Sequence, residues 1–197
     1  MNEFEYFKID VNFTKSFPLI VPDEESDHTN EYIGDKFSPY YQKEIPKPKT
    51  MEFVFGPPIP RNPVVGDYLS QPESVVSKKI ADVMIPMKIK GIQLIPATVM
   101  SNKGDLYEDF YYIHIYNHIE AMDKEKSDFK VNKYGIYFIN SFRLDEKVLK
   151  EIPLKERLVF KLKEKGALKL YHRSVVDAIM ATEPEGVQFI RVENWVL

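Results

Sequence analysis

The chain has 197 residues, of which 44% are hydrophobic and 29% charged, and its formal net charge at pH 7 is −3. This length and composition predict a folded soluble protein with a real core, and they argue against wholesale disorder. The absence of a basic run excludes an electrostatic nucleic-acid footprint. The absence of cysteine excludes disulfides, thiolate catalysis and cysteine-ligated zinc.

The N-terminus carries acidic residues where a signal peptide needs Lys or Arg, and no apolar segment follows it. No stretch approaches the roughly 20 apolar residues that a membrane helix requires. We therefore expect a cytoplasmic protein that does not act at a membrane.

The first third of the chain predicts little regular structure. Residues 4–13 alternate well enough to form a strand. Residues 16–50 mix acids, prolines and tyrosines without a sustained period, which predicts a long loop with at most a short helix. Residues 51–55 predict a short strand, and the proline-rich segment 56–63 ends it.

Residues 75–97 predict a short strand, a helix and a second strand. Ser77 is placed to cap the helix N-terminus. Pro86 ends or kinks the helix, and Gly91 follows where the chain must turn. Four apolar residues recur at helical spacing and form one stripe: Ile80, Val83, Met84 and Met87.

The same pattern returns 95 positions later, in residues 170–192. Without a gap, Asp177 falls on Asp82 and Gly186 falls on Gly91. We interpret the two segments as copies of one strand-helix-strand module. Duplication explains the repeat, and convergence on a common supersecondary unit is the alternative.

Three further strands are expected between the modules, at residues 110–119, 134–139 and 157–162. The whole pattern predicts an α+β, sheet-dominated fold in which two similar strand-helix-strand modules flank a central antiparallel sheet. We expect residues 1–66 to form N-terminal strands and a long loop that pack on a main domain of residues 67–197.

The stretch YYIHIYNHIEAMD, residues 111–123, is where chemistry is most expected, because it carries His114 and His118. On a helix the two rings would lie one turn apart and could share a metal. Apolar residues at alternate positions predict a strand instead, which separates the two rings by about 13 Å. The spacing therefore argues against a metal site.

Other catalytic patterns are absent from the sequence, which lacks the GxSxG, GxxxxGK[ST], GxGxxG and HExxH motifs. We expect no cofactor. The acidic run 23–27 lacks the glycine and the spacing of a calcium-binding EF-hand loop, so a solvated loop is the better interpretation. A second acidic cluster, residues 105–109, is expected in a loop that could also guard a sheet edge.

The order of these parts resembles the DUF1629 family, the immunity proteins associated with bacterial polymorphic toxin systems. The resemblance runs from about Gly56 to the C-terminus, and His114 and His118 are not among its features. It is carried by the two modules, the aromatic strand between them and a set of polar and glycine positions: Asp67, Ser77, Gly91, Asp123, Ser127 and Gly186. Residues of these types at element ends ordinarily serve as caps and turns, so we expect these six to shape the fold.

The resemblance implies a toxin-neutralising protein, not an enzyme, whose partner is a cognate toxin protein. A surface of this kind would combine aromatic anchors with an acidic rim. The candidate anchors are Tyr40, Tyr41, Tyr68, Tyr107, Tyr112 and Tyr116. The candidate rim residues are Asp23, Glu24, Glu25, Asp27, Asp105, Glu108 and Asp109. Two alternatives stay open: a small hydrolase that uses His114 or His118, and a scaffolding subunit.

Overall fold

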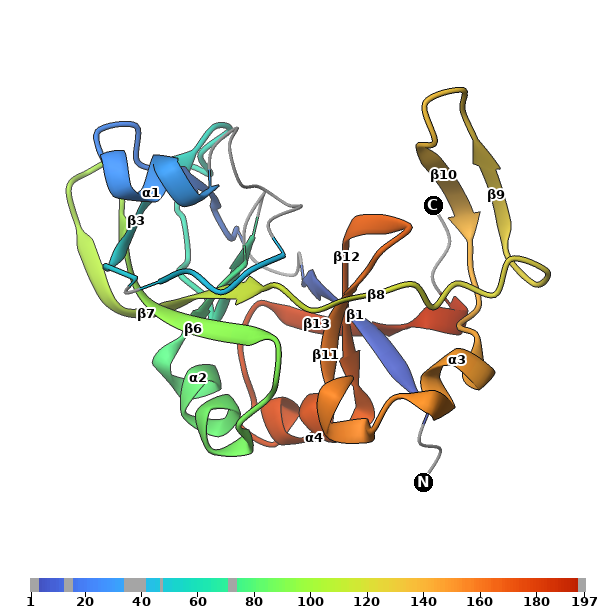
Figure 1. Cartoon of the computed structure of the whole chain (residues 1–197). Coiled ribbons are helices and arrows are strands. Elements are labelled where there is room, and N and C mark those ends of the chain that lie inside the picture. Colours follow the sequence, from blue (N-terminus) through green and yellow to red (C-terminus); the bar gives the residue numbers. More distant parts are fainter. Residues whose placement is uncertain (1–3, 13–15, 34–41, 47, 71–73, 195–197) are drawn as a thin grey trace.

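The computed structural model describes residues 4–12, 16–33, 42–46, 48–70 and 74–194 (Figure 1). Its architecture is α+β and dominated by strands, which confirms the predicted fold class. Two sheets lie beside each other, and a separate two-stranded hairpin projects from one end (Figure 1).

The first sheet has six strands, which lie in the order β2 (Leu19–Pro22), β3 (Met51–Gly56), β6 (Ile92–Met100), β7 (Leu106–Ile115), β5 (Ser74–Ser77) and β4 (Tyr68–Ser70). All neighbours are antiparallel except β3 and β6, which are parallel. The sheet curls until its outermost strands, β2 and β4, approach each other. Its inner face encloses a core that includes Phe53, Val75, Ile95 and Val99.

The second sheet has five strands, which lie in the order β13 (Val187–Arg191), β1 (Tyr6–Val11), β12 (Lys165–His172), β11 (Val159–Leu162) and β8 (His118–Ile119). Only β8 and β11 are parallel. The projecting hairpin consists of β9 (Asp128–Val131) and β10 (Tyr137–Ser141). Strand β1 pairs with β12 and β13, so the first strand of the chain lies between the two strands of the C-terminal module.

Each predicted module is present, and both have the same connectivity. In the first, helix α2 (Lys78–Met84) joins β5 to β6, and β7 lies between these two strands. In the second, helix α4 (Arg173–Met180) joins β12 to β13, and β1 lies between them. The modules therefore occupy separate sheets, and their helices pack against each other (Figure 1).

The helix registers of the two modules agree residue by residue at the 95-residue offset. The buried residues of α2 are Ile80, Ala81 and Met84, and those of α4 are Val175, Val176 and Ile179. These six side chains belong to one core cluster, which fills the space between the two modules. The apolar stripe seen in the sequence is therefore the face through which each helix meets the other module.

The turns that follow the helices also correspond. Lys88 and Glu183 have positive φ values of 46° and 50°, and Gly91 and Gly186 have φ values of 77° and 80°. Only glycine adopts this backbone conformation without cost, which explains its position before β6 and before β13.

The remaining helices are short: α1 (Asp27–Ile33), α3 (Glu146–Glu151) and the 3-10 turns η1 (Ile85–Met87), η2 (Leu154–Glu156) and η3 (Val192–Asn194). The expected long loop at 16–50 contains α1 and also strand β2, which was not predicted because it is an apolar run of only four residues. The expected strand 110–119 is divided, since β7 ends at Ile115 and β8 begins at His118. Backbone amides of Tyr116 and Asn117 bind the carbonyl of Gly91 at this break.

Candidate partner-binding surface

His114 lies within β7 on a strand, as its spacing predicted, but it is not exposed. Only 4% of its surface is accessible. Its ring stacks between Tyr112 and Tyr116, with centroid distances of 6.3 and 5.7 Å. Its Nε2 atom is 2.8 Å from the backbone carbonyl of Lys43. His114 therefore helps to hold the segment 42–46 against β7 of the first sheet.

His118 begins β8 and lines a cleft of about 650 Å³ together with Tyr116, Glu120 and Glu156. Burial lowers its pKa to about 4, and the nearby charge of Lys161 adds to this effect. Its Nε2 atom has no hydrogen-bond partner among the residues that the structure describes.

The carboxylates of this cleft are engaged elsewhere: Glu120 pairs with Lys124 and Lys163, and Glu156 pairs with Lys90. A catalytic histidine needs a partner that orients it and raises its basicity. The His-carboxylate contact that would favour a hydrolase is thus not formed by His118.

Asp67 and Ser77, two of the resemblance positions, contact each other. The Ser77 hydroxyl donates to Asp67 Oδ1 at 2.6 Å, and the backbone amide of Glu185 donates to Asp67 Oδ2 at 2.8 Å. Ser77 occupies the N-cap position of α2 with extended backbone, but its side chain makes no capping hydrogen bond. The predicted capping role of Ser77 is therefore wrong, and its hydroxyl donates instead to the charged acceptor Asp67.

Asp123 and Ser127 organise the turn that leads into β9. Asp123 Oδ1 accepts hydrogen bonds from the backbone amides of Glu125 and Lys126, and the Ser127 hydroxyl accepts one from the Arg143 amide. Such contacts between a side chain and the local backbone fix the turn geometry.

The two acidic clusters both belong to the first sheet. Asp23, Glu24 and Glu25 connect β2 to α1, whose first residue is Asp27, and all four but the half-buried Asp23 are exposed. Asp105 is exposed in the turn before β7, but Glu108 and Asp109 lie within β7 and not in a loop. The strand accommodates both residues in a β-bulge, where Thr98 of β6 faces Glu108 and Asp109 together and the register shifts.

The candidate tyrosine anchors differ in exposure. Tyr68 and Tyr112 are only 2% and 5% exposed and belong to the core, so neither presents a ring to a partner in this structure. Tyr107 is half-buried and stacks on Phe55, and Tyr116 is half-buried beside His114. Tyr40 and Tyr41 lie outside the described residues.

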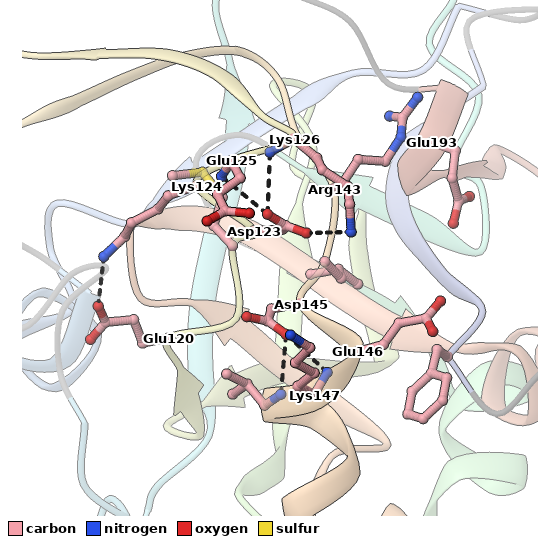
Figure 2. A pocket seen from close by; sticks show the side chains of 14 residues that line it. Glu120, Asp123, Lys124, Glu125, Lys126, Arg143, Asp145, Glu146, Lys147 and Glu193 are labelled. Atoms are coloured by element: carbon pink, nitrogen blue, oxygen red, sulfur yellow. Dashed lines mark hydrogen bonds and ion pairs between the residues drawn. The ribbon is translucent and has the colours of Figure 1, made fainter.

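A cleft of about 940 Å³ lies where the segment 120–126, the start of α3 and η3 meet (Figure 2). Its lining is dense in charge of both signs, including Glu120, Asp123, Lys124, Lys126 and Lys147. The nearest opposite charges satisfy one another: Lys124 is 3.1 Å from Glu120, and Lys126 is 2.8 Å from Asp123. Hydrogen bonds from these lysines lower the pKa values of Glu120 and Asp123, so both carboxylates stay ionised.

The projecting hairpin was only partly predicted, as a single strand at 134–139. It exposes four large apolar side chains: Val131, Tyr134, Ile136 and Phe138. Its other strand, β9, was missed because its alternation of polar residues with Phe129 and Val131 spans only four residues.

Among the described residues, no group of three or more His, Asp or Glu side chains is arranged to hold a metal ion. In the same part of the chain, no helix has both the length and the apolar character needed to cross a membrane.

Fold and surface together define a small α+β protein whose buried polar groups hold the fold together and whose described clefts show no acid-base pair on a histidine. The chain belongs to the Imm11 family of immunity proteins, whose family model matches residues 5–194. The expected class, an immunity protein, is confirmed, with a match that carries the name Imm11 and also covers the N-terminal strands that the resemblance to DUF1629 did not include. No curated protein matches the chain significantly.

Proposed function

We propose that this chain is the immunity protein of a bacterial polymorphic toxin system, which acts in the cytoplasm and neutralises a cognate toxin by direct protein-protein contact. The observation that carries the proposal is the immunity-family match, which spans residues 5–194 and so includes both sheets. The protein acts as a stoichiometric inhibitor in this proposal, and not as an enzyme.

The structure offers two supports for inhibition by contact. His118 has no carboxylate partner within the described part of the chain, and His114 is buried against the backbone of Lys43, so this arrangement does not favour acid-base catalysis by either histidine. The exposed acidic residues of the first sheet, together with half-buried Tyr107 and Tyr116, provide the mixture of charge and aromatic surface that protein interfaces use. A tight complex over such a surface can cover the active site of a toxin or block its assembly.

The test uses the protein encoded next to this chain's own gene. Its C-terminal domain is expressed in bacteria with and without this chain, and growth is recorded. The purified pair is then examined for a complex by size-exclusion chromatography, and toxin activity is titrated with increasing amounts of this chain. We expect growth to be rescued, a stable complex to form, and inhibition to be complete near equimolar amounts. Full protection by a small fraction of an equivalent would instead show that the chain turns over a substrate.

A further inference from the structure

The outer face of the first sheet is the face opposite the core that contains Phe53 and Val99. Other described elements cover this face along only half of its length. At the C-terminal end of β7, Ile113 and Ile115 are buried against α2 in the core shared by the two modules. At the N-terminal end of β7, Leu106 is 57% exposed, and its pairing partner on β6, Met100, is 39% exposed. The described residues therefore leave the beginning of β7 and the end of β6 without a covering layer.

An apolar row crosses this uncovered half. Direct strand pairing places Val21 beside Val54, Val54 beside Met100, and Met100 beside Leu106. Their chain neighbours Ile20, Phe53 and Val99 point to the opposite, inner face and are buried in the core there. Because successive side chains of a strand alternate between faces, the four apolar residues share the outer face.

An acidic row runs beside the apolar one. Glu52 pairs with Thr98, and Thr98 faces the bulge that contains Glu108 and Asp109. The bulge arises because Tyr107 and Phe110 both pack inward although two residues separate them, so Glu108 and Asp109 are both left exposed. Asp23 continues this row, since its backbone amide binds the carbonyl of Glu52.

Three carboxylates of this row form no ion pair with a described residue, although the charge of Lys78 reaches Asp109. Glu52, Glu108 and Asp109 form no hydrogen bond or ion pair through their side chains with any described residue. The large cleft behaves differently, because there Glu120 and Asp123 are each neutralised by a lysine (Figure 2). The negative potential of the sheet face is thus available to a partner, whereas that of the cleft is largely cancelled internally.

We infer that the uncovered half of the sheet, defined by the apolar row and the adjacent acidic row, is the surface that docks the toxin, and that the toxin presents to it a basic surface with an apolar centre. The inference rests on the proposed function. Complementary charge accelerates association, and desolvated apolar side chains at the centre slow dissociation. A toxin face that combines positive charge with an apolar patch meets both rows at once.

Edge protection is the ordinary explanation for two of these carboxylates, Glu108 and Asp109, whereas Glu52 lies on β3, which is paired on both sides. Strand β5 begins to pair with β7 only at Phe110, so no described strand pairs with residues 106–109 on that side. Charged residues at such an edge prevent unwanted strand pairing, and lysine does so as well as an acid. Reversal to lysine therefore preserves edge protection while it removes attraction to a basic partner, which separates the two explanations.

Two matched pairs of variants test the inference. The first pair consists of two triple variants. The sheet charge set replaces Glu52, Glu108 and Asp109 by Lys in one protein, and the control set replaces Glu125, Glu146 and Glu151 by Lys in another. Both sets change net charge equally at exposed sites. The second compares Leu106→Ser with Phe138→Ser, because the two side chains are 57% and 56% exposed. The probe is the C-terminal domain of the protein encoded beside this chain's gene, and association and dissociation rates are measured at low and high salt.

We expect the sheet charge set to slow association about tenfold at low salt, with a smaller effect at high salt. Leu106→Ser should accelerate dissociation about tenfold, because it removes an apolar side chain from the centre of the contact. Both control variants should stay within about twofold of wild type. Melting curves confirm folding, and the isosteric pair Glu108→Gln with Asp109→Asn replaces the charge set if that set does not fold.

The outcomes separate this inference from the proposed function. If the wild-type chain binds the probe but the sheet variants match their controls, the docking surface is wrong and the immunity function stands. Release of the probe by Phe138→Ser alone would move the contact to the β9–β10 hairpin and also overturn the inference. Failure of the wild-type chain to bind would remove the proposed function, and the docking surface with it.

Discussion

The carboxylate of Asp67 joins the two halves of the molecule by binding Ser77 on one side and Glu185 on the other. The Ser77 hydroxyl belongs to the first module, and the Glu185 amide belongs to the turn before β13 in the second. Backbone contacts reinforce this junction, since the Asp67 amide binds the Glu185 carbonyl and the Ser77 amide binds the Asp67 carbonyl. Lys79 adds an ion pair to Asp67 at 3.5 Å.

Replacement of Asp67 by alanine should therefore lower the free energy of unfolding by about 2–4 kcal/mol, because it leaves the Ser77 hydroxyl and the Glu185 amide without their charged acceptor. Urea denaturation measures the change. Asp82→Ala is the matched control: Asp82 forms only an exposed ion pair with Lys78, and its loss should cost less than about 0.5 kcal/mol. Equal effects of the two substitutions would show that Asp67 does not join the modules energetically.

Gly91 is required for two reasons, its backbone conformation and its close approach to a neighbour. Its φ is +77°, and a Cβ atom at this position would collide with the Cβ of Asn117. Gly104 has a similar φ of +88°, but nothing lies within 4 Å of its missing Cβ.

Gly104→Ala should cost about 1 kcal/mol from the left-handed backbone alone. Gly91→Ala should cost about 3 kcal/mol or more, since the overlap with Asn117 is added to that strain. Thermal and chemical denaturation of both variants measure the difference. A similar loss of stability in the two would show that Asn117 moves aside freely.

Tyr112 should act through the fold and not through a partner contact. It is 5% exposed and packs with Phe53 at a centroid distance of 6.0 Å. Tyr112→Ala should lower the free energy of unfolding by about 3–5 kcal/mol, the range typical of a large aromatic truncation in a core. Tyr134→Ala is the comparison, because Tyr134 is 75% exposed and its removal should change stability by less than about 0.5 kcal/mol. A stable Tyr112→Ala protein with faster toxin dissociation would place this ring at the interface instead.

His118 should make stability depend on pH in mildly acidic solution. Burial, with the added charge of Lys161, lowers its pKa from 6.5 to about 4 in the folded protein. The unfolded chain therefore binds more protons than the folded one between these values, and the stabilisation present above pH 6.5 is lost as the pH falls toward 4.

We expect His118 to account for about 1–2 kcal/mol of this loss, after allowance for its partly solvated position. The His118→Gln variant should show a flatter stability profile between pH 7 and pH 4, and NMR titration of the imidazole should give its pKa directly. Lys161→Met should raise that pKa, because it removes a neighbouring positive charge. An imidazole that titrates at its ordinary value would contradict the prediction.

Local sequence patterns were sufficient to predict helices, strands and their buried faces, because these features depend on residues that are close in the sequence. The apolar spacing of Ile80 and Met84, repeated at Val175 and Ile179, predicted both helices and the faces that they bury. The alternation around Ile113 and Ile115 correctly placed His114 on a strand and argued against a shared metal site. Periodicity reports which side of an element is apolar, because the backbone geometry of helices and strands is itself periodic.

The partners of polar and aromatic side chains were decided only by the tertiary structure. Ser77 stands at a helix N-cap, but the approach of Asp67 from another segment gives its hydroxyl a stronger acceptor. Tyr112 and Glu108 are polar or amphipathic residues on the same strand, yet the curl of the sheet buries Tyr112, and a bulge leaves Glu108 exposed without an ion pair to any described residue. Burial and charge neutralisation are sums over residues that are distant in the sequence, so composition and spacing along one segment do not contain them.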